Sequence, residues 1–320
     1  MSTAAVNSPT PPGPTELQIE VTGSCNLSCQ MCLVAYRPRL GRSASLSVDT
    51  VREILDDLPT VRRLTLQGLG EPLLAPGLAA IIEEAIGRGI EVGFNTNGTL
   101  LTAERSAWLV AVGVDWIHVS VDGAIEETFA AIRVGGHLDT VVRNVRGLVD
   151  ARRAAGGTRP WIQLNTVLMR ANHRELESLV RLAADIGVDR MWVQNLSHDF
   201  SDVAADQGFG TIRRWTEQHR LAPGEGATAI ASAAALATEL GVDLRLPGVG
   251  DDDEAGAPTR RADEPGCDWP WRSAYVNHDG TVQASCMLMD RSRVVMGHLK
   301  RRRSACCGAG PATPSCVRPS

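Results

Sequence analysis

Three cysteines stand close together near the start of the chain, in the stretch TGSCNLSCQMCLV at residues 22–34. Cys25, Cys29 and Cys32 have the spacing C-x3-C-x2-C, and no histidine lies beside them. A structural zinc site usually takes four ligands in two separated pairs, and a disulfide would leave one thiol over. A four-iron cluster held by three thiolates instead keeps one iron without a protein ligand, and a small chelating molecule can bind there.

The composition around these cysteines is that of an ordinary globular protein. The chain has 320 residues, of which 43% are hydrophobic and 22% charged, and its formal net charge of −5 gives no reason to expect a nucleic acid or a membrane as partner. The N-terminus lacks the regions of a secretory signal, and no apolar run is long enough to span a bilayer. We therefore expect a cytoplasmic protein, in which eight cysteines favour metal or redox chemistry over disulfides.

The elements that would position the cysteines alternate between strand and helix. This order implies parallel strands joined by right-handed crossovers, in either a barrel or an open doubly wound sheet. In both folds, ligands bind at the carboxyl ends of the strands. The predicted strands cover residues 17–22, 61–72, 90–98, 114–123, 161–169 and 188–196, and the predicted helices cover 46–58, 77–89, 102–113, 125–155 and 172–187. Ser47 and Thr102 are the expected N-caps of the helices 46–58 and 102–113.

Polar motifs follow most of these strands and so predict one active face at one end of the sheet. Asp122, in the motif SVDG, is expected to cap the turn that follows it. Besides the cysteines, the motifs are GLGEP (68–72), NTNG (95–98), SVDG (120–123) and QNLS (194–197).

The cysteine spacing, its place after the first strand and the downstream motifs together resemble the radical S-adenosylmethionine (radical SAM) superfamily. The resemblance implies an α/β fold, a partial (β/α)6 TIM-like barrel with a small C-terminal cysteine-bearing β-hairpin extension. It implies that Cys25, Cys29 and Cys32 bind a 4Fe-4S cluster whose fourth iron takes SAM. An electron from a reductant such as flavodoxin or ferredoxin would cleave SAM to a 5′-deoxyadenosyl radical, which abstracts a substrate hydrogen. Zinc or a structural thiol cluster is the alternative.

The resemblance also assigns residues to SAM binding. Gly70 and Glu71 match the family's GGEP turn, where glycine lets the backbone approach the SAM amino group, although Leu69 replaces the first family glycine. A plain strand-to-helix turn is the alternative for this motif. Ser120 matches a serine that contacts SAM, and Met31 matches a residue whose backbone touches adenine.

Five further positions have two interpretations each. Leu196 should pack near the adenine or simply in the core, and Arg133 should meet a carboxylate or lie solvated at a helix end. Thr96 and Asn97 should face substrate or SAM, or form only an Asn-Gly turn. All seven histidines are expected to be structural or exposed, and His198, beyond the sixth strand, is the one that we would test on the substrate side.

A second set of cysteines lies near the C-terminus. Cys267 and Cys286 flank two alternating runs around the sequence HDG, which predicts a hairpin. This segment resembles the SPASM or twitch extension of radical SAM enzymes, which implies a possible second iron–sulfur cluster at these cysteines. Relatives usually carry a cysteine where Ser285 stands, and a shift of one residue on a strand turns the side chain to the other face.

The composition along the chain predicts five regions. Residues 203–241 look helical and 242–247 form a short strand, so the core continues to a linker rich in glycine, proline and charge. The regions are a disordered leader (1–15), a radical SAM core (16–249), the linker (250–265), a SPASM/twitch-like segment (266–299) and a disordered or aberrant tail (300–320).

The reaction is the least determined property. The resemblance includes enzymes that oxidise or decarboxylate sugars and nucleosides, so we expect a small-molecule substrate of secondary metabolism. A peptide maturase is the alternative, but only about sixteen residues precede the first strand, too few for a folded leader-binding domain. No cobalamin-binding domain is visible. A non-catalytic zinc or iron–sulfur scaffold would explain the cysteines but not the other motifs.

Overall fold

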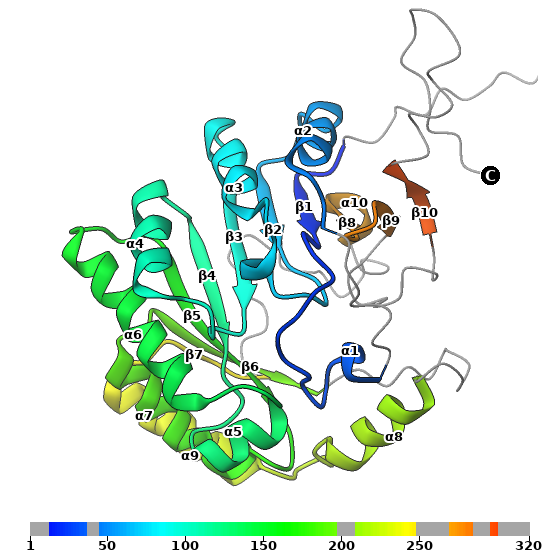
Figure 1. The fold of residues 1–320 in the computed structure, drawn as a ribbon. Helices are drawn as coiled ribbons and strands as arrows, with labels where there is room; N and C mark the ends of the chain where they lie inside the picture. Colours follow the sequence, from blue (N-terminus) through cyan, green and yellow to red (C-terminus); the bar gives the residue numbers. More distant parts are fainter. Residues whose placement is uncertain (1–12, 37–44, 197–208, 248–268, 284–294, 300–320) are drawn as a thin grey trace, which may run out of the picture.

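The computed structural model describes residues 13–36, 45–196, 209–247, 269–283 and 295–299 (Figure 1). His198, Cys267, Ser285 and Cys286 lie outside these residues, as do the predicted linker and tail. The predictions made for them therefore stay predictions.

Seven parallel strands of the described chain lie side by side in sequence order, which is the arrangement that the βα rhythm predicts (Figure 1). Their carboxyl ends consequently share one edge of the sheet. The strands are β1 (Glu16–Ile19), β2 (Arg63–Leu66), β3 (Glu91–Thr96), β4 (Trp116–Ser120), β5 (Trp161–Leu168), β6 (Arg190–Asn195) and β7 (Leu244–Arg245).

The helices begin where the sequence offers caps. The Ser47 hydroxyl accepts a hydrogen bond from Thr50 N at 3.1 Å, and the Thr102 hydroxyl accepts one from Arg105 N at 3.3 Å, as predicted for both helices. The predicted helical region 203–241 divides in two. The helices are α1 (Leu33–Tyr36), α2 (Val48–Asp57), η1 (Pro72–Leu74), α3 (Leu78–Gly87), α4 (Ala103–Val112), α5 (Glu126–Ile132), α6 (Leu138–Ala154), η2 (His173–Glu175), α7 (Leu176–Ile186), α8 (Phe209–His219), α9 (Ala227–Leu240) and α10 (Trp269–Arg272).

The two faces of the parallel sheet differ in polarity. Alternate strand residues point to opposite faces, and one set is apolar and packs into the main core with the helices. This apolar set includes Leu17, Ile19, Leu64, Leu66, Val92, Phe94, Ile117 and Val119. The residues between them carry polar side chains to the inner face, among them Gln18, Glu20, Thr65, Gln67, Asn95, His118, Gln163 and Asn165. Burial against the helices fixes the outer face, so the inner face is left for polar side chains and ligands.

The C-terminal hairpin joins the same sheet. Strand β8 (Ser273–Val276) pairs in parallel with β1, and β9 (Thr281–Gln283) and β10 (Val295–His298) continue the sheet in antiparallel order. The hairpin around HDG is confirmed, whereas its parallel pairing with β1 was not anticipated. In the described part of the chain this open sheet runs in the order β10-β9-β8-β1-β2-β3-β4-β5-β6-β7, which confirms the α/β fold and its partial barrel.

None of the helices in the described ranges is long and apolar enough to cross a membrane. The expected cytoplasmic location stays a prediction.

Candidate functional site

The loop after β1 holds the three cysteines in place through backbone hydrogen bonds to the end of α5. Ser28 N donates to Val134 O and Gln30 N donates to Ile132 O, each at 2.9 Å, and Cys32 N donates to Cys29 O at 3.0 Å. All three thiols are free, and Cys29 is the most buried of them. The loop therefore presents three unoxidised thiols from a fixed backbone.

Polar donors lie beside two of these thiols. The Arg133 Nη1 atom lies 3.8 Å from the Cys29 sulfur, and the Asn97 Nδ2 atom lies 4.0 Å from the Cys25 sulfur. Burial raises the pKa of all three thiols, and that of Cys32 to about 12, so the protonated form is favoured until a metal or cation compensates.

The three thiols fit a multi-iron cluster better than a single zinc ion. Within the described ranges, no three His, Cys, Asp or Glu side chains come close enough together to hold one metal ion. In an iron–sulfur cluster each thiolate binds a different iron, so the sulfurs need not converge on one point. The neighbouring guanidinium and amide donors suit a negatively charged thiolate cluster.

Arg133 forms a buried ion pair, so the interpretation as a solvated arginine at a helix end is wrong. Its Nε donates to Asp122 Oδ2 at 2.6 Å, and the two side chains are 10% and 0% exposed. The other Asp122 oxygen accepts a hydrogen bond from Val167 N at 2.7 Å. The prediction that Asp122 caps the turn after it is wrong, because Ala124 N in that turn donates to Glu175 Oε2 at 2.7 Å. Asp122 instead fixes the guanidinium that lies next to Cys29.

The turn after β2 presses against the cysteine loop. A Cβ on Gly70 would lie 2.0 Å from Thr22 O, so any other residue would displace one of the two segments. Glu71 N donates to Ser24 O at 2.8 Å. The glycine at this position is thus required by the chain's own backbone, and the turn and the cysteine loop form one unit.

The Glu71 carboxylate is buried and accepts hydrogen bonds from three groups of the protein. Its oxygens accept hydrogen bonds from Leu73 N at 3.1 Å, from the Thr96 hydroxyl at 2.7 Å and from Asn97 N at 2.8 Å. Burial raises the pKa of this carboxyl, although the hydrogen bonds act in the opposite direction. Glu71 therefore connects the turn to the end of β3 and holds Asn97 beside Cys25.

Thr96 and Asn97 form the expected Asn-Gly turn, whereas their contact with substrate or SAM stays a prediction. Gly98 has a φ of 75°, as an Asn-Gly turn requires. The Asn97 amide nevertheless reaches the cysteine loop, since its Nδ2 donates to Asn26 Oδ1 at 2.9 Å and lies near the Cys25 sulfur.

Leu69, which departs from the family motif, packs against a small apolar cluster that is separate from the main core. Leu33, Phe209 and Ile212 form this cluster, which joins α1 to α8. The backbone N–H of Leu69 donates to Glu20 Oε2 at 2.8 Å. The side chain therefore connects the turn to α8, a contact that glycine could not make.

Met31 and Leu196 meet in another small apolar cluster near the ends of β5 and β6. Ile132, Met169 and Leu196 are its buried members, and Met31 packs against them. Ser120, by contrast, ends β4 on the inner face, opposite Asn165 on β5. The structure thus brings the predicted adenine-contacting residues together and places Ser120 on the polar side.

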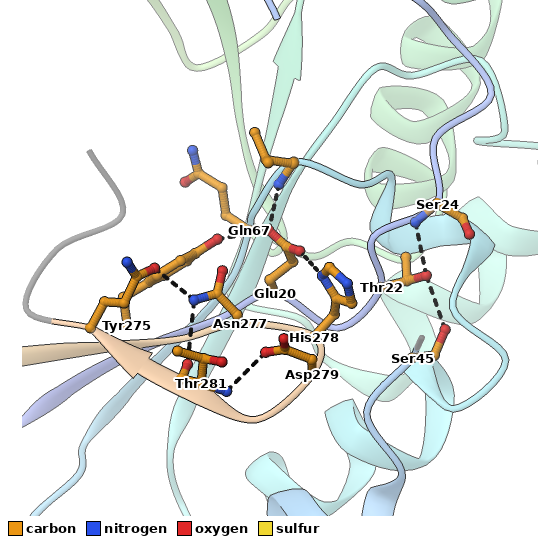
Figure 2. Close-up of polar contacts among 12 residues, drawn as sticks. Glu20, Thr22, Ser24, Ser45, Gln67, Tyr275, Asn277, His278, Asp279 and Thr281 are labelled. Carbon is orange, nitrogen blue, oxygen red and sulfur yellow. Dashed lines mark hydrogen bonds and ion pairs between the residues drawn. The ribbon is translucent and has the colours of Figure 1, made fainter. Parts of the chain in front are cut away.

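A second buried polar network lies where the hairpin meets β1 (Figure 2). Glu20 is 1% exposed and accepts hydrogen bonds from the Tyr275 hydroxyl at 2.7 Å and from Leu69 N, and it pairs with His278 Nδ1. We did not identify these residues from the sequence. A charged residue at an inner strand position was the available signal, but nothing local indicates a partner more than 250 residues away.

Comparison with known families matches this chain to the Radical SAM superfamily over residues 19–183, which is more than half of its length. The matched segment runs from β1 through most of α7, and so includes the three cysteines, the turn after β2 and the Asp122–Arg133 pair.

Individual proteins show the same similarity. The chain is 32% identical over 185 residues to a tungsten-containing aldehyde ferredoxin oxidoreductase cofactor-modifying protein of Pyrococcus furiosus, covering 56% of this chain and 51% of that protein. It is 30% identical over 169 residues to the mycofactocin maturase MftC of Mycobacterium tuberculosis, covering 52% and 41%. The chain thus spans about half the length of the curated relatives that it matches.

Among solved structures, the fold resembles that of Streptococcus suis SuiB bound to the precursor peptide SuiA. The TM-score is 0.66 with 14% sequence identity, and the match covers 87% of this chain and 61% of SuiB. At this identity the likeness concerns the fold alone.

Proposed function

The chain belongs to the radical SAM superfamily and is a radical SAM enzyme, and from this premise we propose that it oxidises or decarboxylates a small molecule of secondary metabolism. The observation that carries the site assignment is the set of three free thiols at the carboxyl end of β1, with donors from Arg133 and Asn97 beside them. In this proposal Cys25, Cys29 and Cys32 hold the 4Fe-4S cluster as thiolates.

When bound, the reduced cluster and SAM supply a 5′-deoxyadenosyl radical that abstracts a hydrogen atom from the substrate. The protein's own part is electrostatic and geometric. Arg133 offsets the negative charge of the thiolates at Cys29, and Asp122 keeps its guanidinium in that position. Asn97, held by Glu71, donates toward the Cys25 sulfur.

SAM would contact the edge of the sheet through several segments of this chain. The backbone at Gly70 would receive its amino group, while Glu71 holds the turn through its hydrogen bonds to Leu73 N and Asn97 N. Met31 would contact adenine through its backbone and Leu196 through its side chain, and Ser120 would offer a hydroxyl from the inner face. The apolar cluster also excludes water from the reacting groups.

The direct test is conversion of SAM to 5′-deoxyadenosine by protein reconstituted without oxygen. Dithionite or reduced flavodoxin supplies the electron, and the product is measured by chromatography with mass detection. We expect C29A to lose product formation by at least about 100-fold, because one iron loses its ligand. S28A, at the exposed neighbouring residue, is the matched control. Equal activity in C29A and the wild type would exclude the ligand role.

Two observations favour a small-molecule substrate. The relative from Pyrococcus furiosus is described as modifying a cofactor, and the inner face of the sheet carries amide and hydroxyl side chains, which suit a compact hydroxylated substrate. The similarity to MftC supports the alternative, a peptide maturase.

A substrate panel separates these two candidates. Reconstituted enzyme with SAM is incubated with nucleosides and nucleotide sugars in one series and with synthetic precursor peptides in the other. Loss of two hydrogens from a compound indicates an oxidoreductase, and loss of carbon dioxide indicates a lyase. Turnover of a peptide, with none of any small molecule, would replace the first proposal by the second.

A further inference from the structure

The Glu20 carboxylate joins three segments that are distant in sequence (Figure 2). It extends from the end of β1, accepts Leu69 N from the turn after β2, and accepts the Tyr275 hydroxyl from the hairpin. Its other oxygen faces His278 Nδ1. Because a carboxylate accepts hydrogen bonds, the ring nitrogen that faces it, Nδ1, carries a hydrogen.

In the tautomer whose one ring hydrogen lies on Nδ1, His278 Nε2 has a bare lone pair. The atom is buried, the residue is 3% exposed, and Nε2 has no hydrogen-bond partner among the described residues. Buried polar atoms are nearly always paired, so one that is not calls for a ligand or another explanation. A histidine that is oriented through Nδ1 by a carboxylate is the usual form of a general base or a metal ligand.

The position of His278 places this lone pair at the active edge. Strand β8 runs parallel to β1, so His278, two residues after β8, emerges at the same edge as the cysteine loop. The ring lies directly against Gly23, two residues before Cys25. A Cβ on Gly23 would lie 2.6 Å from His278 Cε1 and 2.9 Å from Nε2, so only glycine leaves room for the ring.

We propose that His278 Nε2 is the proton-accepting group for a hydroxyl of the substrate, and that Glu20 is the residue that positions it. This inference rests on the proposed function, since it concerns the substrate of the same site. The substrate O–H donates to Nε2. On transfer the O–H bond breaks, its electron pair stays on oxygen, and the proton forms an N–H bond on the ring. The resulting positive charge faces the Glu20 carboxylate.

The first test is a crystal structure of the full chain loaded with cluster and SAM, prepared without oxygen. We expect Nδ1 on Glu20 and Nε2 in contact with water or ligand in a space that reaches the SAM site. A protein donor on Nε2, from any segment, would overturn the proposal. Formation of 5′-deoxyadenosine is measured separately, so a failed site and a failed radical function give different results.

The second test compares variants of His278 and Tyr275, which both bond the Glu20 carboxylate. The turnover of a substrate identified by the panel above is measured. H278Q keeps a hydrogen-bond acceptor but cannot take the proton at neutral pH, so kcat should fall by about 100-fold with little change in KM. Y275F removes the other hairpin hydrogen bond to Glu20 and should change kcat by less than about threefold. Equal losses of kcat in the two variants would show that His278 serves packing only.

A solution measurement checks the tautomer without any substrate. Long-range proton–nitrogen spectra of histidine-labelled protein, assigned with H278Q, should show hydrogen on Nδ1 in the wild type and in Y275F. In E20Q this preference should weaken, because the amide no longer bears the charge that fixes it. Hydrogen on Nε2 in the wild type would contradict the proposal.

Discussion

The two ends of the inner sheet face bury polar groups in different ways. At the carboxyl end, ionisable side chains from separate segments form ion pairs and hydrogen bonds with one another, as in the Asp122–Arg133 pair beside Cys29. At the amino end, the first residues of four strands form cation–aromatic stacks. Arg63 lies 5.4 Å from the ring of Trp116, and Arg190 lies 4.7 Å from that of Trp161.

The difference shows which end can do chemistry. His118 lies between the two tryptophans, with its ring centroid 4.4 Å from Trp116, and burial lowers its pKa to about 3, helped by Arg63 and Arg190. It carries no charge at neutral pH and fills space. Thiols and paired carboxylates gather instead at the carboxyl end, where parallel α/β folds bind ligands. Four predictions test this difference between the two ends.

The largest effect should come from breaking the buried pair at the carboxyl end. R133M leaves the Asp122 carboxylate buried without its cation, so the free energy of unfolding should fall by about 3–5 kcal/mol. Denaturant titration measures it. The double variant D122N/R133M should recover a large part of the loss, since no unpaired charge is left. A loss of less than about 1 kcal/mol in R133M would mean that the pair is not buried in solution.

A smaller loss is expected at Glu71. E71Q keeps the shape but turns an amide toward one of three donors, so unfolding should become easier by about 1–3 kcal/mol. E104Q, on the surface of α4, is the matched control and should be neutral within about 0.5 kcal/mol. If both variants behave alike, the contribution of the Glu71 network to stability is excluded.

At the amino end, burial of His118 should make the free energy of unfolding depend on pH in the acid range. The folded-state pKa of His118, about 3, lies below the ordinary value of 6.5, so the unfolded chain takes up the proton first as the pH falls. This residue should therefore lower stability below pH 6.5, by at most about 1.4 kcal/mol per pH unit, until about pH 3. The difference between the wild type and H118Q in denaturant titrations at several pH values isolates this contribution. A flat difference would refute it.

The smallest effect should come from one cation–aromatic contact at the same end. R190Q removes the guanidinium above Trp161 together with its ion pair to Asp243 at 2.7 Å, and should cost about 0.5–1 kcal/mol of stability. Formation of 5′-deoxyadenosine should be unchanged, because Arg190 begins β6 at the end away from the cysteines. A loss of activity comparable to that of C29A would erase the functional distinction between the two ends.

Much of the fold was predictable because it is locally encoded. Alternation of apolar residues located the strands, and the Ser47 and Thr102 caps located helix starts. The parallel pairing of β8 with β1 was not predictable, since a strand pattern does not name its neighbour. That pairing is set by contacts between residues some 250 positions apart.

The site divides in the same way. The three cysteines and the turn at Gly70 are short motifs, so the sequence indicated their place at one edge. The partners of Arg133 and Glu20 depend on tertiary packing, which brings Asp122 to the first and Tyr275 and His278 to the second. The pattern singled out His198 instead, which lies outside the described residues.

The central claim is that three thiolates hold a 4Fe-4S cluster with one iron open to SAM. Electron paramagnetic resonance of the reconstituted and reduced full chain tests it directly. We predict a reduced-cluster signal that changes shape when SAM is added, and loss of this signal in C29A. Protein that carries zinc in place of iron and sulfide, or a cluster signal that does not respond to SAM, would contradict the account.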